Sequence, residues 1–179
     1  MILAIDPGIR GCGVALGYSG RLRAAAYVPS SVRTGADIAA CVAMARAVVA
    51  WQRNAWCGTE ARIDEVVCEW PQTYTASKQK GDPNDLLPLA GVDCAICAFY
   101  PDVRHVTYRP SEWKGQLPKP HRVSDSNPME QRVLARLDAE EQSRIMLPSA
   151  RGLQHNTIDA VGLLLHHLVR FERHRVIAR

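Results

Sequence analysis

The sequence lacks a long apolar run, and this absence excludes several classes of protein. None of its apolar stretches reaches the roughly 18 residues that a membrane-spanning helix needs. At the amino end, no basic segment precedes an apolar one as it would in a secretory signal. We therefore expect a cytoplasmic protein with no membrane-bound form. Because neither an internal repeat nor a long linker divides the chain, we expect residues 1–179 to form one domain.

The two common phosphate-binding loops are also missing. No Gly-Lys-Ser/Thr sequence is present, which excludes a P-loop. The glycines of residues 8–13 read G-x-x-G-x-G and lead into an expected strand, whereas a dinucleotide loop reads G-x-G-x-x-G and opens onto a helix. Asp6, which precedes them, would repel a pyrophosphate. We expect no nucleotide cofactor.

The six cysteines do not form a metal-binding pattern. Cys94 and Cys97 make a single C-x-x-C inside an apolar stretch that reads as a helix, so we interpret them as small residues of a packed helix. Apolar or small neighbours predict reduced, buried thiols at four positions, Cys12, Cys41, Cys68 and Cys94.

Positive charge is modest but unevenly placed. The net charge of +4 and the pI near 8.8 permit nucleic-acid binding without requiring it. The lysines fall in two polar stretches that contain proline and glycine, "YTASKQKGDPND" and "SEWKGQLPKPHR". Such stretches are either solvated surface or, beside a carboxylate site, phosphate contacts.

Hydrophobic periodicity predicts strands and helices in a definite order. Strands are expected at 2–5, 13–18, 21–28, 63–70 and 102–109. Helices are expected at 35–56, from the residue after Asp85, at 127–142 and at 155–171. The second of these helices has Pro88 in its first turn, and the third has Asn127 as N-cap with Pro128 directly after it. A three-strand meander followed by alternating strands and helices predicts an α/β fold, a mixed sheet with helices on both faces.

Three carboxylates stand at notable places in this order. Asp6 ends the first strand, Glu69 ends the strand at 63–70, and Asp159 lies near the start of the last helix. Each has an ordinary explanation by itself: Asp6 could cap its own turn, Glu69 could be a surface acid, and Asp159 could be the third residue of a helix capped by Asn156.

Taken together, the three acids favour a different interpretation. Ligands bind at the carboxyl ends of parallel strands, where Asp6 and Glu69 would converge. Carboxylates brought close in a cleft repel one another unless a cation lies among them. Oxygen ligands favour Mg²⁺ or Mn²⁺, and two such ions about 4 Å apart can hold the attacking and leaving oxygens of a phosphodiester. This is the chemistry of a nuclease.

The sequence resembles the RuvC family of Holliday junction resolvases in the RNase H-like superfamily, and most of all its short, divergent phage-like members. The matching segments, in order, are "ILAIDPGIRGCGVAL", "VVCEWPQ", "YRPSEWKG" and "HNTIDAVGLLLHHL". The resemblance implies an RNase H-like mixed five-stranded sheet, a two-metal mechanism with Mg²⁺ for which Mn²⁺ can substitute, and a homodimer that nicks a four-way DNA junction symmetrically.

The resemblance also assigns roles to residues. It implies that Asp6, Glu69 and Asp159 are catalytic metal ligands. The family carries a second acid, or a histidine, three residues before the last aspartate, where this chain has Asn156. We therefore expect the neighbouring His155 to be a metal ligand or a contact to the scissile phosphate.

Further residues are expected to bind DNA. The family has a stacking aromatic after the second carboxylate, for which Trp70 and Tyr74 are candidates. Cations of the matching regions complete the predicted DNA contacts: Arg10, Lys78, Lys80, Lys114 and Lys119.

A stripe of small residues suggests how a dimer could form. Ala90, Cys94 and Ala98 recur at every fourth position of the expected helix and would let another backbone approach closely. That backbone belongs either to a second subunit or to the sheet of the same chain.

Other functions remain open at this stage. A monomeric RNase H-like nuclease acting on structured RNA would share the aspartate–glycine hairpin. A fragment of an actin-like or sugar-kinase-type ATPase would share it too, although that fold needs two such domains. A DNA-structure binder without catalytic activity is the third alternative.

Overall fold

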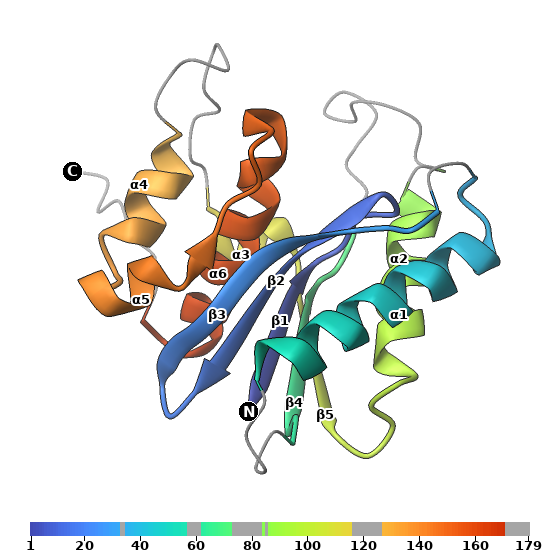
Figure 1. The fold of residues 1–179 in the computed structure, drawn as a ribbon, viewed down its shortest axis with the longest axis horizontal. Coiled ribbons are helices and arrows are strands. Elements are labelled where there is room, and N and C mark those ends of the chain that lie inside the picture. Colours follow the sequence, from blue (N-terminus) through green and yellow to red (C-terminus); the bar gives the residue numbers. More distant parts are fainter. Residues whose placement is uncertain (33–34, 57–61, 73–83, 85, 116–126, 171–179) are drawn as a thin grey trace.

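A six-stranded sheet separates two groups of helices (Figure 1). The computed structural model describes residues 1–32, 35–56, 62–72, 84, 86–115 and 127–170. The strands are β1 (Ile2–Asp6), β2 (Gly11–Tyr18), β3 (Arg21–Pro29), β4 (Glu65–Glu69), β5 (Arg104–Tyr108) and β6 (Ile145–Met146). The helices are α1 (Ile38–Ala55), α2 (Leu86–Cys97), α3 (Pro110–Trp113), α4 (Pro128–Leu134), α5 (Ala139–Ser143) and α6 (Gln154–His167), with a short 3₁₀ turn at Arg151–Leu153 before α6.

The strand order is β5-β4-β1-β2-β3-β6. Strands β1, β2 and β3 pair antiparallel as the predicted meander, whereas β4 runs parallel to β1 and β5 runs parallel to β4. The predicted mixed sheet with helices on both faces is confirmed. One strand more than the expected five is present, because the two residues of β6 pair in parallel with β3.

Alternation along the strands divides the apolar residues between two cores. In β1, Leu3 and Ile5 face the core formed with α1 and α2, while Ala4 faces the core formed with α4 and α6. The same period of two places Asp6 on the face of Ala4, and Glu69 on the face of Val67. Both carboxylates therefore lie on the α6 side of the sheet.

The predicted helix at 127–142 is in fact two helices. Asn127 caps α4 through its side chain and Pro128 occupies the first turn, as expected. A second helix begins because the Asp138 carboxylate accepts from the backbone N–H of Glu141, and the Glu141 carboxylate accepts from the N–H of Asp138. This reciprocal capping starts α5 where the sequence pattern suggested a continuous helix.

The helix α2 differs from the prediction at one cysteine. Pro88 lies in its first turn as expected, while Asp85 lies outside the described residues. Cys94 is exposed, so the prediction of a buried thiol is wrong there, because Val92, Asp93 and Ile96 are the residues of α2 that are buried. The prediction is confirmed for three thiols that are buried and free, Cys12, Cys41 and Cys68.

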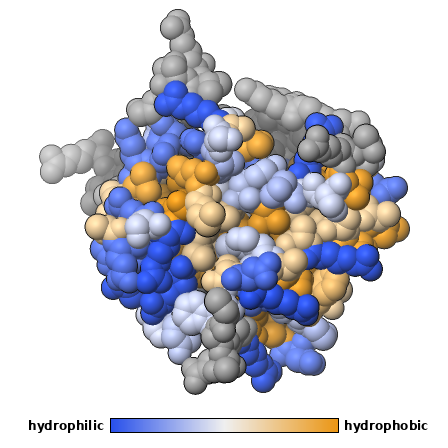
Figure 2. Space-filling model, in the orientation of Figure 1, coloured by the Kyte–Doolittle hydropathy of each residue, from blue (hydrophilic) through white to orange (hydrophobic). Residues whose placement is uncertain are grey.

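On the face seen in Figure 2, apolar and polar surface is interspersed. Within the described ranges, no helix combines the length and the hydropathy that crossing a membrane requires.

Candidate active site

Two of the predicted carboxylates end neighbouring strands. Asp6 is the last residue of β1 and Glu69 the last residue of β4, and the parallel register pairs Ile5 with Cys68 immediately before them. Their side chains point to the same face of the sheet, and the Asp6 residue is only 9% exposed. The convergence at a carboxyl edge, inferred from the two strand ends, is therefore present.

Close packing of α6 brings Asp159 to the same place. Gly13 pairs with Asp6 across the antiparallel ladder, and a Cβ at Gly13 would lie 1.8 Å from the backbone oxygen of Asn156. Only a residue without a side chain lets the first turn of α6 rest on β2 at this distance. Because α6 begins at Gln154, Asn156 is not its N-cap and Asp159 lies in its second turn, which removes the simple capping explanation.

Each glycine in the stretch after Asp6 thus makes room for a different neighbour. A Cβ at Gly8 would lie 2.4 Å from the oxygen of Gly11 inside the tight turn. A Cβ at Gly11 would lie 2.1 Å from the Tyr27 hydroxyl oxygen, so Gly11 makes room for that ring on the neighbouring strand. Chain packing therefore accounts for the glycine pattern.

Lys114 joins the acids. Its Nζ lies 2.8 Å from Oδ2 of Asp159 and 2.9 Å from Oε2 of Glu69, and its side chain is 26% exposed. The sequence predicts Lys114 as a phosphate contact in a polar loop. The structure places its ammonium between two of the site carboxylates.

Trp113, which sequence reasoning did not single out, orients Glu69. Its side chain is fully buried, and its Nε1–H donates to Oε2 of Glu69 at 2.8 Å. A Cβ at Gly162 of α6 would lie 2.7 Å from the indole Cζ3, so this glycine makes room for the ring. A buried indole N–H needs an acceptor. The tryptophan next to the lysine in "SEWKG" is the feature of the sequence that could have pointed to this hydrogen bond.

Burial and mutual repulsion dominate the electrostatics of the cluster. Burial raises the pKa of Asp6 well above its usual range, the negative charges of Glu69 and Asp159 raise it further, and only Lys114 opposes them. Burial also raises the pKa of Glu69, against the lowering effects of the Lys114 charge and the Trp113 hydrogen bond. The surrounding carboxylates raise the pKa of Lys114 despite its burial, so this side chain stays charged.

The chemical type of the donor atoms suits a hard divalent cation. All the acidic donors are carboxylate oxygens, which Mg²⁺ and Mn²⁺ prefer, and among the described residues no hydrogen bond reaches the Asp6 carboxylate. In the same residues, however, no group of three or more His, Cys, Asp or Glu side chains is arranged to hold an ion as it stands. Among the described residues, the Lys114 ammonium is the positive charge that contacts the oxygens of Glu69 and Asp159.

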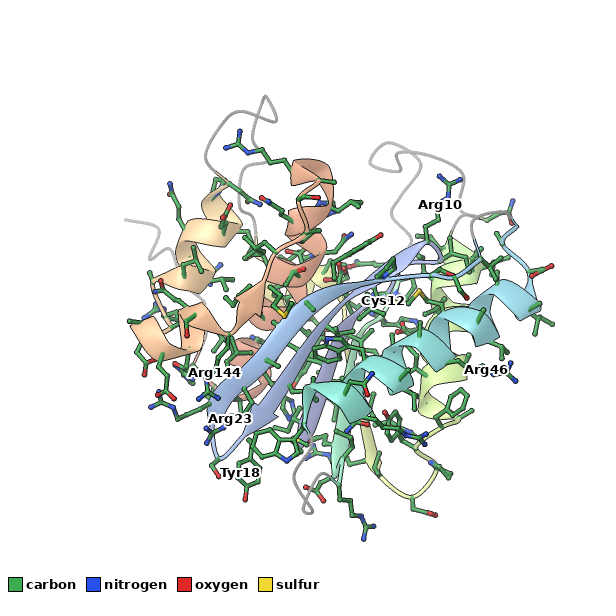
Figure 3. The ribbon with its side chains drawn as sticks, viewed as in Figure 1. Arg10, Cys12, Tyr18, Arg23, Arg46 and Arg144 are labelled. Carbon is green, nitrogen blue, oxygen red and sulfur yellow. The ribbon has the colours of Figure 1, made fainter. Side chains whose placement is uncertain are left out.

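The other predicted site residues either surround this cluster or lie outside the residues that the structure describes. His155 is exposed on the first turn of α6, one turn before Asp159 and on the same helix face. Trp70 directly follows Glu69 and is 38% exposed. Arg10 is exposed in the turn between β1 and β2, at the edge where β1 ends (Figure 3). Four predicted DNA contacts lie outside the described residues: Tyr74, Lys78, Lys80 and Lys119.

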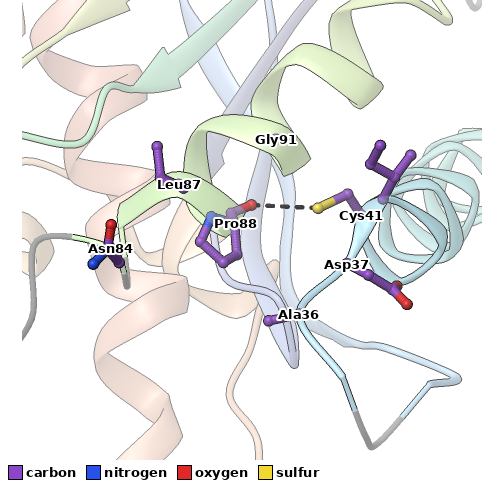
Figure 4. Close-up of a pocket in the computed structure, with 8 residues that line it drawn as sticks. Ala36, Asp37, Cys41, Asn84, Leu87, Pro88 and Gly91 are labelled. Atoms are coloured by element: carbon purple, nitrogen blue, oxygen red, sulfur yellow. Dashed lines mark hydrogen bonds between the residues drawn. The ribbon is translucent and has the colours of Figure 1, made fainter.

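A groove between the starts of α1 and α2 is unrelated to the carboxylates (Figure 4). Its volume is about 430 Å³ and apolar side chains such as Leu87 line it. Asp37, the acid in the described part of its lining, already caps α1 by accepting from the Ala40 N–H at 2.9 Å.

We predict that Gly13→Ala forces α6 away from the sheet. The added methyl group would overlap the backbone of Asn156, which cannot rotate away as a side chain could. Urea unfolding should show a loss of roughly 2–3 kcal/mol in the free energy of unfolding. Gly152→Ala is the control, since nothing lies within 4 Å of its Cβ position, and should change stability by less than about 0.5 kcal/mol. Equal stability of the two variants would contradict the packing role of Gly13.

We predict that Asp6→Asn stabilises the protein at neutral pH when a chelator is present. The pKa of Asp6 is raised in the folded state, so the unfolded chain loses this proton first as the pH rises and the fold is progressively destabilised. Removing the charge should raise the free energy of unfolding at pH 7 and change it little near pH 4, where the carboxyl is largely protonated in the folded state. Denaturation across this pH range, with the exposed Asp102→Asn as control, measures the difference. If Asp6→Asn were less stable than the parent at pH 7, the charge of Asp6 would not be destabilising the fold.

No protein-family model and no curated protein matches the sequence. Several solved structures are similar to the chain over most of its length, and the following three are among them. RuvC from Thermus thermophilus has 20% identity and a TM-score of 0.49, with 93% of each chain covered. T. thermophilus RuvC in complex with Holliday junction substrate has 18% identity and a TM-score of 0.46, with 93% of this chain and 92% of that chain covered. The yeast mitochondrial Holliday junction resolvase Ydc2 has 8% identity and a TM-score of 0.47, with 95% and 81% covered. The likeness is one of fold.

Proposed function

We propose that this protein is a metal-dependent endonuclease that cuts phosphodiester bonds in branched DNA, acting on four-way junctions as a symmetric dimer. The observation that carries the proposal is that Asp6 and Glu69 end neighbouring parallel strands, while Lys114 contacts both Glu69 and Asp159. Asp6 lies near enough to the other two acids for their charges to raise its pKa. Acids from three distant parts of the chain are held together there against their own repulsion, which is the arrangement that a cation-assisted hydrolase needs.

In this proposal Asp6, Glu69 and Asp159 hold Mg²⁺ or Mn²⁺, with His155 as a further ligand or as a contact to the scissile phosphate. The bound ions would supply a water-derived nucleophile and stabilise the charge that develops on the phosphate. Trp113 keeps the Glu69 carboxylate in a fixed orientation through its 2.8 Å hydrogen bond. Asp6 is nearly buried, so little of its own carboxylate is open to bulk water.

The DNA strand would lie along the edge that carries these acids. Arg10 projects from the turn after Asp6 and is available to a phosphate, and the partly exposed Trp70 is available for stacking on a base. Tyr74, Lys78, Lys80 and Lys119 remain proposed contacts on sequence grounds. Arg10 and the three lysines would give the substrate strand a positive border beside the acidic centre.

The helix α2 supports the proposed dimer. It is apolar all round, yet only Val92, Asp93 and Ile96 are buried, while Leu87 is 68% exposed. A helix that is hydrophobic on every side is normally covered. In the stripe of small residues, Cys94 and Ala98 are exposed and do not pack on the sheet of their own chain, which favours a second subunit as the partner.

We predict Mg²⁺-dependent cleavage of a labelled four-way junction, and its loss in Asp6→Asn. Removing one of the acids should slow cleavage by at least about 100-fold, because transition-state charge is no longer stabilised. Binding of the junction in chelator should persist, since Asp6 is nearly buried and contributes no positive charge. The assay compares junction, duplex, flap and hairpin RNA, each with Mg²⁺ and with chelator.

The matched control is Asp102→Asn, an exposed aspartate in the turn before β5, which should cleave like the parent. Cleavage by Asp6→Asn at the parental rate, or cleavage in chelator, would refute the proposed site. Cleavage of hairpin RNA without cleavage of the junction would indicate a nuclease for structured RNA instead.

We predict that the protein is a dimer and that Cys94→Glu dissociates it. A carboxylate in the centre of an apolar helix interface would be desolvated without a partner, so the dissociation constant should rise by about 100-fold or more. Ala50→Glu places the same charge on the exposed side of α1 and serves as the control. Sedimentation equilibrium with and without junction DNA gives the result. A wild-type protein that stays monomeric in both conditions would contradict the dimer.

A further inference from the structure

The Lys114 ammonium contacts the very oxygens that a divalent cation would use. Its Nζ lies 2.8 Å from Oδ2 of Asp159, 2.9 Å from Oε2 of Glu69 and 3.2 Å from Oε1 of Glu69. An ammonium and a divalent cation repel each other strongly at such distances in a partly buried site. The two therefore cannot share these oxygens.

We propose that Lys114 is the internal counter-ion of the metal-free site, and that its side chain must leave Glu69 and Asp159 before a divalent cation binds. This inference rests on the proposed function, because it concerns the same three acids. In this proposal Lys114 competes with the metal for the carboxylate oxygens, in addition to making the phosphate contact expected from the sequence.

The charge balance explains why such a counter-ion is needed. Asp6 and Asp159 come from β1 and α6, and each buried carboxylate left without a positive partner would cost folding free energy. Lys114 contributes the one positive charge that the described residues place in contact with the cluster. The fold thus tolerates its acids without metal, at the expense of metal affinity.

The surroundings of Lys114 let the side chain move while the backbone stays fixed. Its N–H donates to the oxygen of Pro110 at 2.9 Å, and its own carbonyl accepts from Nη1 of Arg132 at 3.2 Å. Its Nζ lies over the Trp113 ring, 4.9 Å from the ring centroid, and about a quarter of the side chain is already exposed. Rotations about the flexible lysine stem are sufficient to carry the ammonium out to solvent.

The test measures Mn²⁺ binding to the full chain without DNA, by electron paramagnetic resonance of free Mn²⁺ during a titration. Lys114→Gln removes the competing charge and should bind Mn²⁺ about tenfold more tightly than the wild type. Lys114→Arg keeps the charge and should bind within about twofold of the wild type. Thermal unfolding gives an independent readout, since Mn²⁺ should raise the Tm of Lys114→Gln by more than it raises the wild-type Tm.

Arg10→Gln is the matched control for long-range charge. Arg10 is an exposed cation at the same edge and contacts no carboxylate among the described residues, so its removal should change Mn²⁺ affinity by less than about twofold. An equal gain in Arg10→Gln and Lys114→Gln would overturn the proposal, because the effect would then be one of net charge.

Equal or weaker Mn²⁺ binding by Lys114→Gln would also overturn it and would leave the proposed nuclease function intact. Absence of Mn²⁺ binding in every protein, the wild type included, would instead refute the metal site and this inference together. Lys114→Met replaces the Gln variant if that variant does not fold. Folding of either variant only when Mn²⁺ is present supports the proposal, and failure of both to fold even then would show that Lys114 is structural.

Discussion

The structure depends on one electrostatic constraint: in the part of the chain that is described, three carboxylates at a poorly solvated edge of the sheet have one ammonium, that of Lys114, beside them. Asp6 is the most buried of the acids and has no hydrogen bond among the described residues, while Glu69 and Asp159 share Lys114. Burial and like charge both raise the pKa of Asp6. Such an arrangement is unfavourable for folding. Titratable groups perturbed in this way cluster at functional sites, which is why the carboxylates are the candidate site.

Close contacts at glycines allow this edge to form. Gly13 lets α6 rest on β2 and so brings Asp159 to Asp6, and Gly162 lets Trp113 pack against α6 and reach Glu69. Both contacts join elements that lie far apart in the sequence. A methyl group at either position would act on the distances among the acids without touching an acid directly.

The proposed site and the proposed dimer surface lie on different parts of the molecule. The acids face α6, whereas α2 covers the opposite face of the sheet together with α1 (Figure 1). Pairing through the outer side of α2 would leave both carboxylate clusters open to a DNA strand. The lack of buried residues on the outer side of α2, and not the groove beside it, is the feature on which the proposed dimer rests.

By itself, the sequence determined the mixed sheet with helices on both faces, the carboxylates at two strand ends, and the start of α4 at Asn127, because periodicity, strand-end acids and caps are local signals. It did not determine the break before α5, the exposure of Cys94, or the first residue of α6. Only the tertiary structure decided that Trp113 supports Glu69 and that Lys114 lies among the acids. These contacts join α3 to β4 and α6 across many tens of residues, and no spacing along a chain specifies which side chains meet when separate elements pack.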